Sequence, residues 1–402
     1  KLIPETPEYS LIREGVKSGN EQVIKDFYNI LDSLQKSGAQ KETKGTKKTA
    51  IEAHREAHNI TVDQICEKIK KMTKGGVYLG FKKMDETLKL LLGDFMLIEA
   101  MSSHGKTTFM LNTMINLIKS EKNKGNNPMV FYYPYESSAP KIYLKLLNTI
   151  AQENIVEFNS SMPNDATEQE PSPLGDYSIT DKDKFKTTKE TLQTYITDKS
   201  LVIPQGRYSL EDIESCIESY SNDKEFDGRT KIFMFDYIQI IKTAKASDAK
   251  MNWLDKDKVA EDLARIAEDN ECIVIAGSQL TDKFEIAQAK SIYNAVSLSF
   301  RIFNHSHAKI KNNADAKLAE RYIHRYEGKM TLSIDITKSR NFDSQEWDKQ
   351  FYLKDGNTIG EYRQGELENI LKEDQETKAL EKGDALREVS GNDAQAWIDQ
   401  NK

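Results

Sequence analysis

The fold is decided by the stretch Phe95-Met96-Leu97-Ile98-Glu99-Ala100-Met101-Ser102-Ser103-His104-Gly105-Lys106-Thr107-Thr108. Its first residues form a short apolar run typical of a buried strand, and an amphipathic helix follows, with Phe109, Met110 and Leu111 among its apolar positions. A strand, a short polar loop and a helix in this order suit a phosphate-binding loop, because the loop N–H groups and the helix N-terminus present positive potential to an anion. The sequence therefore predicts a phosphate site directly after this strand.

Two residues of the predicted loop have defined chemical roles. Lys106 would reach the β- and γ-phosphates of a nucleoside triphosphate, and Thr107 would coordinate Mg²⁺. The strict pattern requires Gly where Ala100 stands, so a chance Gly-Lys-Thr at a helix start is the alternative. We expect His104 to be a filler whose side chain points away from phosphate. The expected ligands are ATP and Mg²⁺, and the predicted binding residues are Ser102, Ser103, His104, Gly105, Lys106, Thr107 and Thr108.

Further apolar runs follow the loop and alternate with longer amphipathic stretches. They lie at residues 129–133, 201–203, 232–235, 273–276, 298–303 and 332–336. Continuous apolar strands that alternate with helices predict an α/β fold with a mostly parallel sheet covered on both faces. For the run at 298–303, a buried helix segment is the alternative.

The chain is expected to contain four regions. A helical N-terminal segment and a basic linker occupy residues 1–49, and a linker helix occupies residues 50–74. The main domain covers residues 75–362 and contains a polar insertion at about 152–181, which we interpret as mobile. Residues 363–402 form an acidic tail. Because the chain begins at Lys1, we expect it to start downstream of the initiator Met.

Composition excludes several classes of protein. The 402 residues carry a net charge of −7, and 30% of them are charged, so we expect a highly solvated protein. The sequence contains no apolar stretch of ~18 residues, which excludes a membrane-spanning helix. Cys66, Cys216 and Cys272 lie far apart, which argues against disulfides and a cysteine zinc site and favours the cytosol. The acidic balance disfavours nucleic-acid binding over the whole surface, but it permits a local basic channel.

Two carboxylates follow predicted strands. Asp236 comes at the end of the run at 232–235, and Glu136 follows the run at 129–133. Neighbouring parallel strands deliver their carboxyl ends to the same crevice, so both side chains are expected near the loop. Asp236 would hold the water shell of Mg²⁺, and Glu136 would orient or deprotonate the attacking water. The alternatives are an ordinary strand-end Asp and a helix N-terminal Glu.

In their order and flanks, these residues resemble the C-terminal RecA-like ATPase domain of DnaB-type replicative helicases. A loop that begins with Ala100 is the usual form in that family. The resemblance covers about residues 75–352, and its further motifs are Tyr135-Glu136-Ser137, Asp236-Tyr237-Ile238-Gln239, Gly277-Ser278-Gln279-Leu280 and Lys338-Ser339-Arg340-Asn341. It implies a RecA-like P-loop NTPase core, with Glu136 as the catalytic glutamate. It also implies that Gln279 senses the γ-phosphate and that Lys338 and Arg340 reach the nucleotide of a neighbouring subunit.

The resemblance also implies a biological role. The protein would be a cytoplasmic, hexameric, ATP-dependent helicase that moves 5′ to 3′ on single-stranded DNA and unwinds duplex at a replication fork. The expected partners are single-stranded and forked DNA, further copies of the chain, and a primase, helicase loader or polymerase. By position, two DNA-facing loops lie at residues 242–258 and 281–290. Lysines at such spacing can follow a phosphate backbone, and the predicted DNA-contacting residues are Lys242, Lys245, Lys250, Lys283 and Lys290. Without the resemblance, these lysines would be interpreted as a solvated run of charges.

The sequence departs from the family pattern after Leu280. Thr281-Asp282 stands where Asn-Arg is usual, residues 291–299 lack the family's acids, and Phe342 replaces a common Gly. These departures leave two alternatives open. One is a RecA-like recombinase or clock-type ATPase that does not unwind DNA. The other is a scaffold that binds ATP only to assemble.

Overall fold

The computed structural model describes residues 60–158, 173–175, 177–243, 253–281, 292–304, 325–326, 329–340, 346–354, 356–363 and 366. The chain divides into two units, Lys1–Ile65 and Cys66–Lys402, and the fold belongs to the second. The predicted segment 1–49, residues 50–59 of the predicted linker helix and the tail from 367 onward lie outside the described residues. None of the described helices has the length and apolar character needed to cross a membrane.

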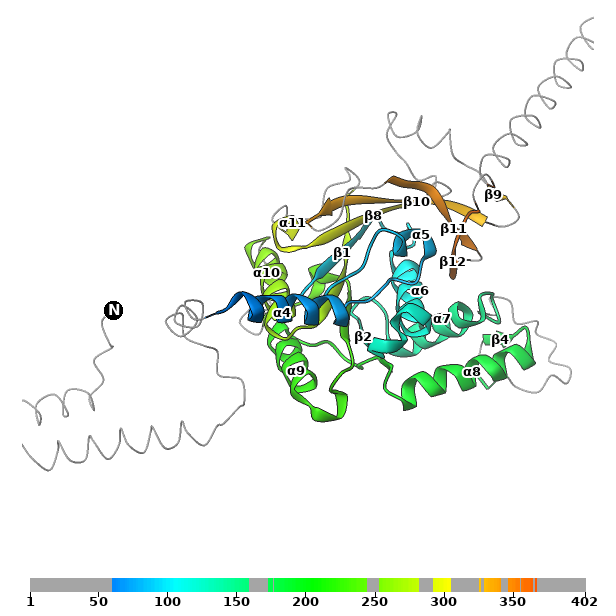
Figure 1. Cartoon of the computed structure of the whole chain (residues 1–402). Coiled ribbons are helices and arrows are strands. Elements are labelled where there is room, and N and C mark those ends of the chain that lie inside the picture. Colours follow the sequence, from blue (N-terminus) through cyan, green and yellow to red (C-terminus); the bar gives the residue numbers. More distant parts are fainter. Residues whose placement is uncertain are drawn as a thin grey trace, which may run out of the picture. The chain divides into compact units, whose positions relative to one another are not determined.

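One large sheet forms the centre of the second unit (Figure 1). Its strand order is β12-β11-β10-β8-β1-β7-β6-β2-β5, and β9 pairs with β10 outside this path. The bounds are β1 Phe95–Ala100, β2 Met129–Pro134, β5 Leu201–Val202, β6 Lys231–Asp236, β7 Ile273–Gln279, β8 Leu298–Asn304, β9 Arg325–Tyr326, β10 Lys329–Ser339, β11 Glu346–Lys354 and β12 Thr358–Glu361. The strands from β8 to β5 are parallel, and β10, β11 and β12 extend the sheet in antiparallel pairs.

The apolar runs of the sequence are strands of the sheet, parallel except for the run at 332–336, which lies in the antiparallel β10. Every residue of β1 and of β2 is buried, as expected for strands covered on both faces. The run at 298–303 is the strand β8, parallel to β1, so the alternative of a buried helix is wrong there. The predicted α/β fold with a mostly parallel sheet is confirmed.

Helices cover both faces of this sheet (Figure 1). The described helices are α4 Val62–Gly75, α5 Lys82–Asp85, α6 Lys106–Lys119, α7 Ala139–Ala151, α8 Lys182–Thr197, α9 Leu210–Asn222, α10 Trp253–Asp269 and α11 Ile292–Ala295, with 3₁₀ turns η1 Glu121–Asn126, η2 Lys224–Phe226 and η3 Ile238–Ile240. Side chains alternate along a strand. Met96 and Ile98 of β1 therefore join the hydrophobic cluster of α6 and α7, whereas Phe95 and Leu97 join that of α9 and α10.

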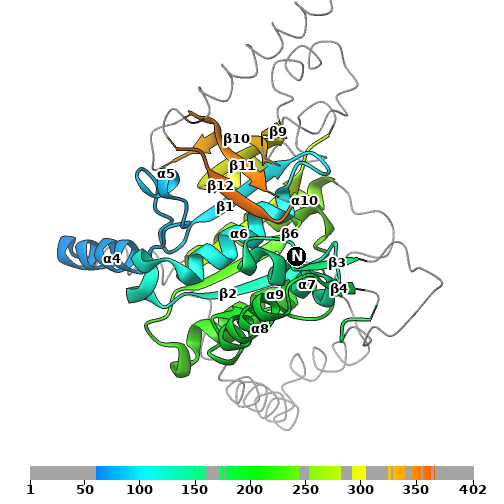
Figure 2. The ribbon, with the colours of Figure 1, turned by 90° about the vertical axis from the view of Figure 1, so that its right-hand side faces the viewer.

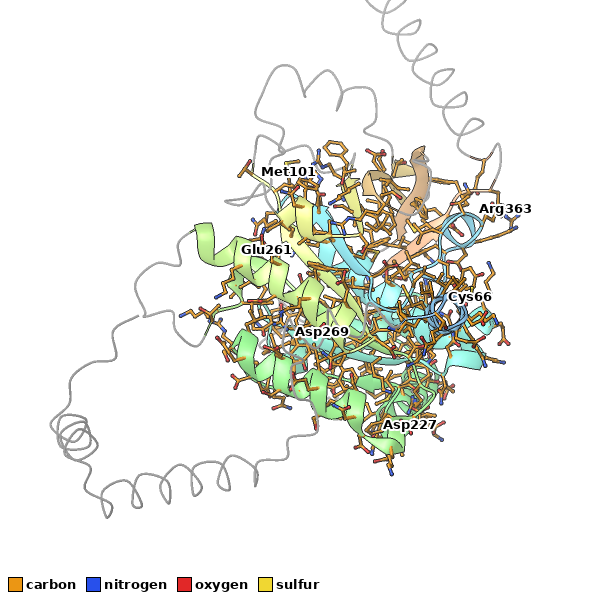
Figure 3. All side chains as sticks on the ribbon, turned by 60° about the vertical axis from the view of Figure 1, so that its left-hand side comes forward. Cys66, Met101, Asp227, Glu261, Asp269 and Arg363 are labelled. Atoms are coloured by element: carbon orange, nitrogen blue, oxygen red, sulfur yellow. The ribbon has the colours of Figure 1, made fainter. Side chains whose placement is uncertain are left out.

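Side chains fill the space between the sheet and these helices (Figure 3). In that view Met101 marks the loop after β1, and Glu261 and Asp269 lie along α10. The three cysteines are free thiols, and they range from the exposed Cys66 to the buried Cys272.

The helix α4 precedes the sheet domain. It ends at Gly75, and Gly76 passes Leu90 so closely that a Cβ atom would come within 2.5 Å of the Leu90 carbonyl oxygen. The apolar side chains of Val62 and Ile69 on α4 are exposed. The helix thus ends where the sequence places the start of the main domain.

The antiparallel edge of the sheet is held against α6, the helix that follows the loop predicted to bind phosphate (Figure 2). The Asn112 amide on α6 donates to the Asn357 carbonyl at 2.7 Å and accepts from the Ile359 N–H at 3.1 Å. Thr108 Oγ1 donates to the Gly356 carbonyl at 3.1 Å. The turn between β11 and β12 is therefore held against the first two turns of α6.

The insertion predicted at 152–181 has ordered ends. β3 (Val156–Phe158) and β4 (Tyr177–Ile179) form a separate antiparallel pair. The Asn148 side chain on α7 binds this pair, because it accepts from the N–H groups of Ile155 and Val156 and donates to the Val156 carbonyl. Both strands lie within the predicted insertion, residues 159–172 and 176 lie outside the described part, and the mobility of the insertion stays a prediction.

Candidate active site

The loop between β1 and α6 has the backbone of an anion-binding turn. Ser103 and Gly105 both adopt the left-handed conformation, with φ of 66° and 89°. Gly105 begins α6 without a side-chain cap, so the first N–H groups of this 14-residue helix remain available to a ligand. The sequence signature has therefore produced the strand, turn and helix that phosphate binding requires.

Three side chains converge on the carboxylate of Asp236 at the end of β6. Lys106 Nζ lies 2.8 Å from Asp236 Oδ1, while the hydroxyls of Thr107 and Tyr132 donate to Oδ2 at 2.7 and 2.9 Å. Burial alone would raise the pKa of Asp236, but the Lys106 charge and these hydrogen bonds bring that pKa below its ordinary value. The carboxylate is thus held ionised beside the loop, where Thr107 and Asp236 supply the oxygen ligands that Mg²⁺ prefers.

A glycine makes this arrangement possible. A Cβ on Gly277 of β7 would lie 3.1 Å from Lys106 Cδ and 3.3 Å from Asp236 Oδ1. The Lys106 ammonium also lies 4.4 Å from the centre of the Tyr237 ring, a cation–π contact. Packing therefore favours glycine at position 277, because a side chain there would crowd Lys106 and Asp236, and the sequence motif alone does not reveal this.

Glu136 follows β2, which pairs with β6, the strand that ends at Asp236. The N–H groups of Tyr135 and Glu136 donate to the Asp236 carbonyl at 3.0 and 3.3 Å, which fixes the chain after β2 beside the end of β6. The Glu136 side chain is exposed and lines a pocket of about 370 Å³, together with Ser137 and Arg207. The carboxylate of Glu136 is therefore accessible, while its backbone is held beside the end of β6.

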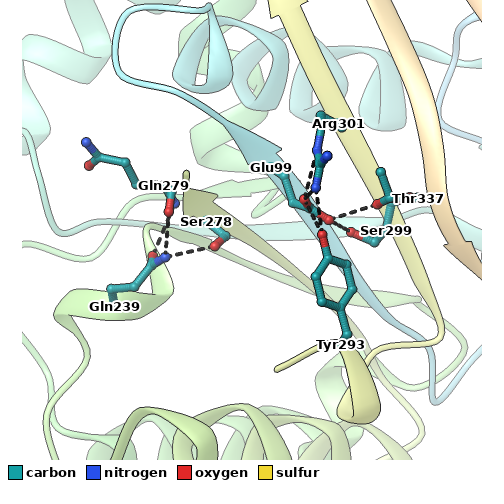
Figure 4. Close-up of polar contacts among 8 residues, drawn as sticks. All are labelled: Glu99, Gln239, Ser278, Gln279, Tyr293, Ser299, Arg301 and Thr337. Atoms are coloured by element: carbon teal, nitrogen blue, oxygen red, sulfur yellow. Dashed lines mark hydrogen bonds and ion pairs between the residues drawn. The ribbon is translucent and has the colours of Figure 1, made fainter. Parts of the chain in front are cut away.

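Gln279 ends β7 directly beside the loop. It pairs with Ala100 in the sheet, and the Leu280 N–H donates to the Ala100 carbonyl at 2.9 Å. The side chain of Gln239 holds this end of β7, because it donates to Ser278 Oγ at 2.8 Å and to the Gln279 carbonyl at 3.2 Å. The Gln279 side chain points away from Gln239 (Figure 4). Gln239, whose role the motif did not reveal, therefore orients the residue that was predicted to sense phosphate.

Arg340 lies at the other end of β1, whereas Lys338 is level with the middle of β1, because Lys338 pairs with Ser299 of β8 and Ser299 pairs with Leu97. The Arg340 N–H donates to the Ser297 carbonyl at 3.0 Å, and the Ser297 N–H donates to the Phe95 carbonyl at 2.9 Å. Phe95 begins β1 and the loop follows its last residue, so roughly 17 Å of strand separates the Arg340 backbone from the chain's own phosphate site at ~3.3 Å per residue. A single subunit therefore does not bring Arg340 to its own loop.

Two residues of the predicted phosphate loop direct their side chains elsewhere. His104 is buried, packs against the Phe303 ring and accepts the Asn304 N–H at 3.1 Å through Nδ1. The Thr108 hydroxyl faces the turn between β11 and β12. Ser102 and Ser103, by contrast, are exposed.

The predicted DNA-contacting lysines are only partly described. Lys242 is exposed, and its carbonyl accepts the Leu210 N–H at 2.8 Å, so it lies beside the start of α9. Lys245, Lys250, Lys283 and Lys290 lie outside the described residues.

Sequence reasoning missed two buried polar residues. Tyr132 packs its ring in the core, and its hydroxyl also contacts Asp236. Glu99 is fully buried and ion-paired with Arg301. The available signal was a lone glutamate inside an otherwise apolar strand, immediately before the loop.

Comparison with known proteins decides the family. The model of the DnaB-like helicase C terminal domain matches residues 76–296, which is more than half of the chain. The chain belongs to this family. The predicted resemblance and the RecA-like fold are therefore confirmed for this DnaB-like helicase domain. No curated protein sequence matches the chain.

Two solved structures share the fold of this DnaB-like domain. One is described as an "ATPase Domain", with 17% identity, a TM-score of 0.52, and coverage of 75% of this chain and 97% of that one. The other is described as "The Structure Of A DnaB-Like Replicative Helicase And Its Interactions With Primase", with 16% identity, a TM-score of 0.54, and coverage of 87% and 80%. At these identities the likeness establishes the fold alone.

Proposed function

We propose that this DnaB-like protein is an ATP-dependent replicative DNA helicase that works as a hexameric ring of identical subunits. It moves 5′ to 3′ on single-stranded DNA and unwinds duplex at a fork. The observation that carries the proposal is the placement of two half-sites at opposite ends of β1. Lys106, Thr107 and Asp236 lie at one end, and Arg340 lies at the other.

The chain's own residues account for nucleotide binding. The N–H groups of the loop and of α6 would hold the phosphates, and Lys106 would move from Asp236 onto the β- and γ-phosphate oxygens. Thr107 Oγ1 and Asp236 would hold Mg²⁺, directly or through its water shell. Mg²⁺ bound there would neutralise charge on the β- and γ-phosphates.

Glu136 would act on the attacking water. Its backbone is tied to the Asp236 carbonyl, and its carboxylate is exposed on the neighbouring strand end. A carboxylate in that place can accept a proton from the water as the water attacks the γ-phosphorus. Gln279, beside the start of the loop, would contact the γ-phosphate and report its presence to the residues that follow β7.

A second subunit would complete the site. Negative charge grows on the γ-phosphoryl oxygens in the transition state, and a guanidinium placed against them lowers the barrier. Since Arg340 lies roughly 17 Å of strand away from its own loop, it can serve this purpose only in a neighbour's site. ATP turnover would then depend on the subunit interface, which couples hydrolysis to movement around the ring.

DNA and partner contacts follow from the same arrangement. Lys242, Lys245, Lys250, Lys283 and Lys290 would contact the phosphate backbone of a single strand in the central channel. One solved structure of the same fold is described with a primase, so we include a primase among the partners, together with a loader or polymerase.

Paired assays test the proposed function. Lys106→Ala should abolish phosphate release from ATP, and retained turnover would show that the site assignment is wrong. The wild-type protein should displace a strand from a forked substrate with ATP and Mg²⁺. DNA-dependent ATP turnover without displacement would instead favour a recombinase-like role, and ATP binding without turnover would favour an assembly scaffold.

A further inference from the structure

Glu99 is the centre of a buried polar cluster that joins four elements of the fold (Figure 4). Its Oε2 accepts from the Tyr293 hydroxyl at 2.5 Å and from Arg301 Nε and a terminal Arg301 nitrogen at 3.2 and 2.8 Å. Its Oε1 accepts from the Ser299 hydroxyl, and from Thr337 Oγ1 at 2.8 Å. The donors come from α11, β8 and β10, whereas Glu99 itself lies on β1, one residue before its end.

This cluster is complete enough to be rigid. A buried carboxylate is costly unless it is paired and its oxygens are hydrogen-bonded, and both conditions hold here. Burial and the Glu99 carboxylate raise the pKa of Tyr293 to about 12, so its hydroxyl stays protonated and donates. A terminal Arg301 nitrogen lies 2.9 Å from the same hydroxyl, which closes a triangle between Glu99, Tyr293 and Arg301.

The cluster also holds an irregularity in β10. The pairing of β10 with β8 shifts between Ile336 and Lys338, where Thr337 is an extra residue. In a regular strand, Thr337 and Lys338 would point to opposite faces of the sheet. The bulge lets both contact the face that carries α11, and the bond from Thr337 to Glu99 holds the bulged residue.

The residues that follow the bulge are Lys338 and Arg340, which are proposed to act in the neighbouring subunit's nucleotide site. Lys338 Nζ donates to the Tyr293 carbonyl, and the Arg340 guanidinium donates to the Asn294 carbonyl. The Tyr293 hydroxyl is bound to Glu99, so a single tyrosine connects the strand before the phosphate loop with the lysine of the trans pair.

We propose that Glu99 is a positioning residue for the trans pair Lys338 and Arg340. By holding Thr337 in the bulge and Tyr293 beside it, Glu99 sets the direction in which β10 leaves the sheet, and hence where the trans pair meets the neighbour's nucleotide. The inference rests on the proposed function, since it assigns Glu99 to the same composite site. It adds a residue that contacts no nucleotide itself and acts through Lys338 and Arg340 of its own subunit, which reach the neighbour's nucleotide.

A double-mutant cycle separates positioning from a general structural effect. Arg340→Ala should lower kcat for ATP by about a thousandfold. Glu99→Gln should lower kcat by about tenfold, because misplaced groups lose much of their effect, and should leave the affinity for a fluorescent ATP analogue unchanged. In the Arg340→Ala background, Glu99→Gln should have almost no further effect, since the residue that it positions is already gone. Thermal unfolding and light scattering would verify folding and assembly of each variant.

A milder matched pair guards against misfolding of Glu99→Gln. Thr337→Val removes only the hydroxyl that reaches Glu99, whereas Thr331→Val removes a hydroxyl on the same strand that contacts the Tyr362 hydroxyl instead. Thr337→Val should lower kcat severalfold with nucleotide affinity unchanged, and Thr331→Val should not.

The possible failures can be told apart. If Glu99→Gln lowers kcat equally in both backgrounds, or if the two threonine variants behave alike, the positioning role is wrong while the proposed function stands. If Arg340→Ala retains wild-type turnover, the trans site and the positioning role are both wrong. Weaker nucleotide binding in Glu99→Gln would place its effect on the adjacent loop and would also overturn the inference.

Discussion

Tyr132→Phe tests whether the network around Asp236 is as tight as the structure indicates. The phenol ring is fully buried on β2, and its hydroxyl donates to Asp236 Oδ2 at 2.9 Å. Phenylalanine fills the same space, so the substitution removes one hydrogen bond and leaves no cavity around the ring. A hydrogen bond to a charged group contributes ~1.5–3 kcal/mol, so we expect the free energy of unfolding to fall by about 2 kcal/mol without nucleotide.

The loss should depend on pH. Burial alone would raise the pKa of Asp236, but the Lys106 charge and three hydrogen bonds hold it below its ordinary value of 3.8. A group whose pKa is lower in the folded state stabilises the protein above its unfolded pKa and loses that contribution as pH falls through the folded pKa. The penalty of Tyr132→Phe should therefore be complete near neutral pH, shrink below about pH 4, where Asp236 of the unfolded chain takes up a proton, and vanish once the lowered pKa of the folded state is passed.

Urea unfolding followed by circular dichroism measures this effect, with Tyr133→Phe as the matched control. Tyr133 is the next residue on β2, but it lies on the opposite face of the sheet and stacks on the Phe235 ring. A change below about 0.5 kcal/mol in Tyr132→Phe at neutral pH, or an equal loss in both variants, would refute the assigned hydrogen bond to a charged Asp236.

Three further outcomes follow from the structure. Burial raises the pKa of Asp85 to about 6, so the folded state favours the protonated carboxyl and the free energy of unfolding falls as pH rises toward 6. In urea titrations, Asp85→Asn should raise the free energy of unfolding by about 1 kcal/mol near pH 7.5, after allowance for solvent screening, and by less near pH 4.5. Gly277→Ala should weaken ATP binding at least about tenfold in equilibrium titrations, because its Cβ would crowd Lys106; unchanged affinity would contradict that packing. The double variant Lys245→Ala, Lys250→Ala should bind single-stranded DNA more weakly in fluorescence anisotropy. The slope of log affinity against log salt concentration should become shallower by about 1 to 2, and an unaltered slope would show that this loop does not contact DNA.

The local parts of the phosphate site could be predicted well. The strand, loop and helix around Lys106 are contiguous in the chain, so their geometry follows from local periodicity and glycine placement. The sequence also predicted that Asp236 and Glu136 lie close together, and their strands β6 and β2 do pair in parallel, which brings their carboxyl ends to one edge of the sheet. The insertion was less predictable, since its ends are ordered by Asn148 of a preceding helix, a contact that composition does not reveal.

By itself, the sequence determined the fold class, the phosphate loop and the family, because these depend on residues close together in the chain and on motifs in a fixed order. Only the tertiary structure decided that Tyr132 completes the Asp236 network, that Glu99 carries a buried cluster, and that Arg340 lies at the far end of β1 from its own loop. The first depends on the register of β2 against β6, and the other two depend on the register of β10 against β8 and on the bulge at Thr337, all of which arise from pairing between distant segments. A shift of one residue in that pairing would turn the same side chains to the opposite face, and no local pattern records which register is formed.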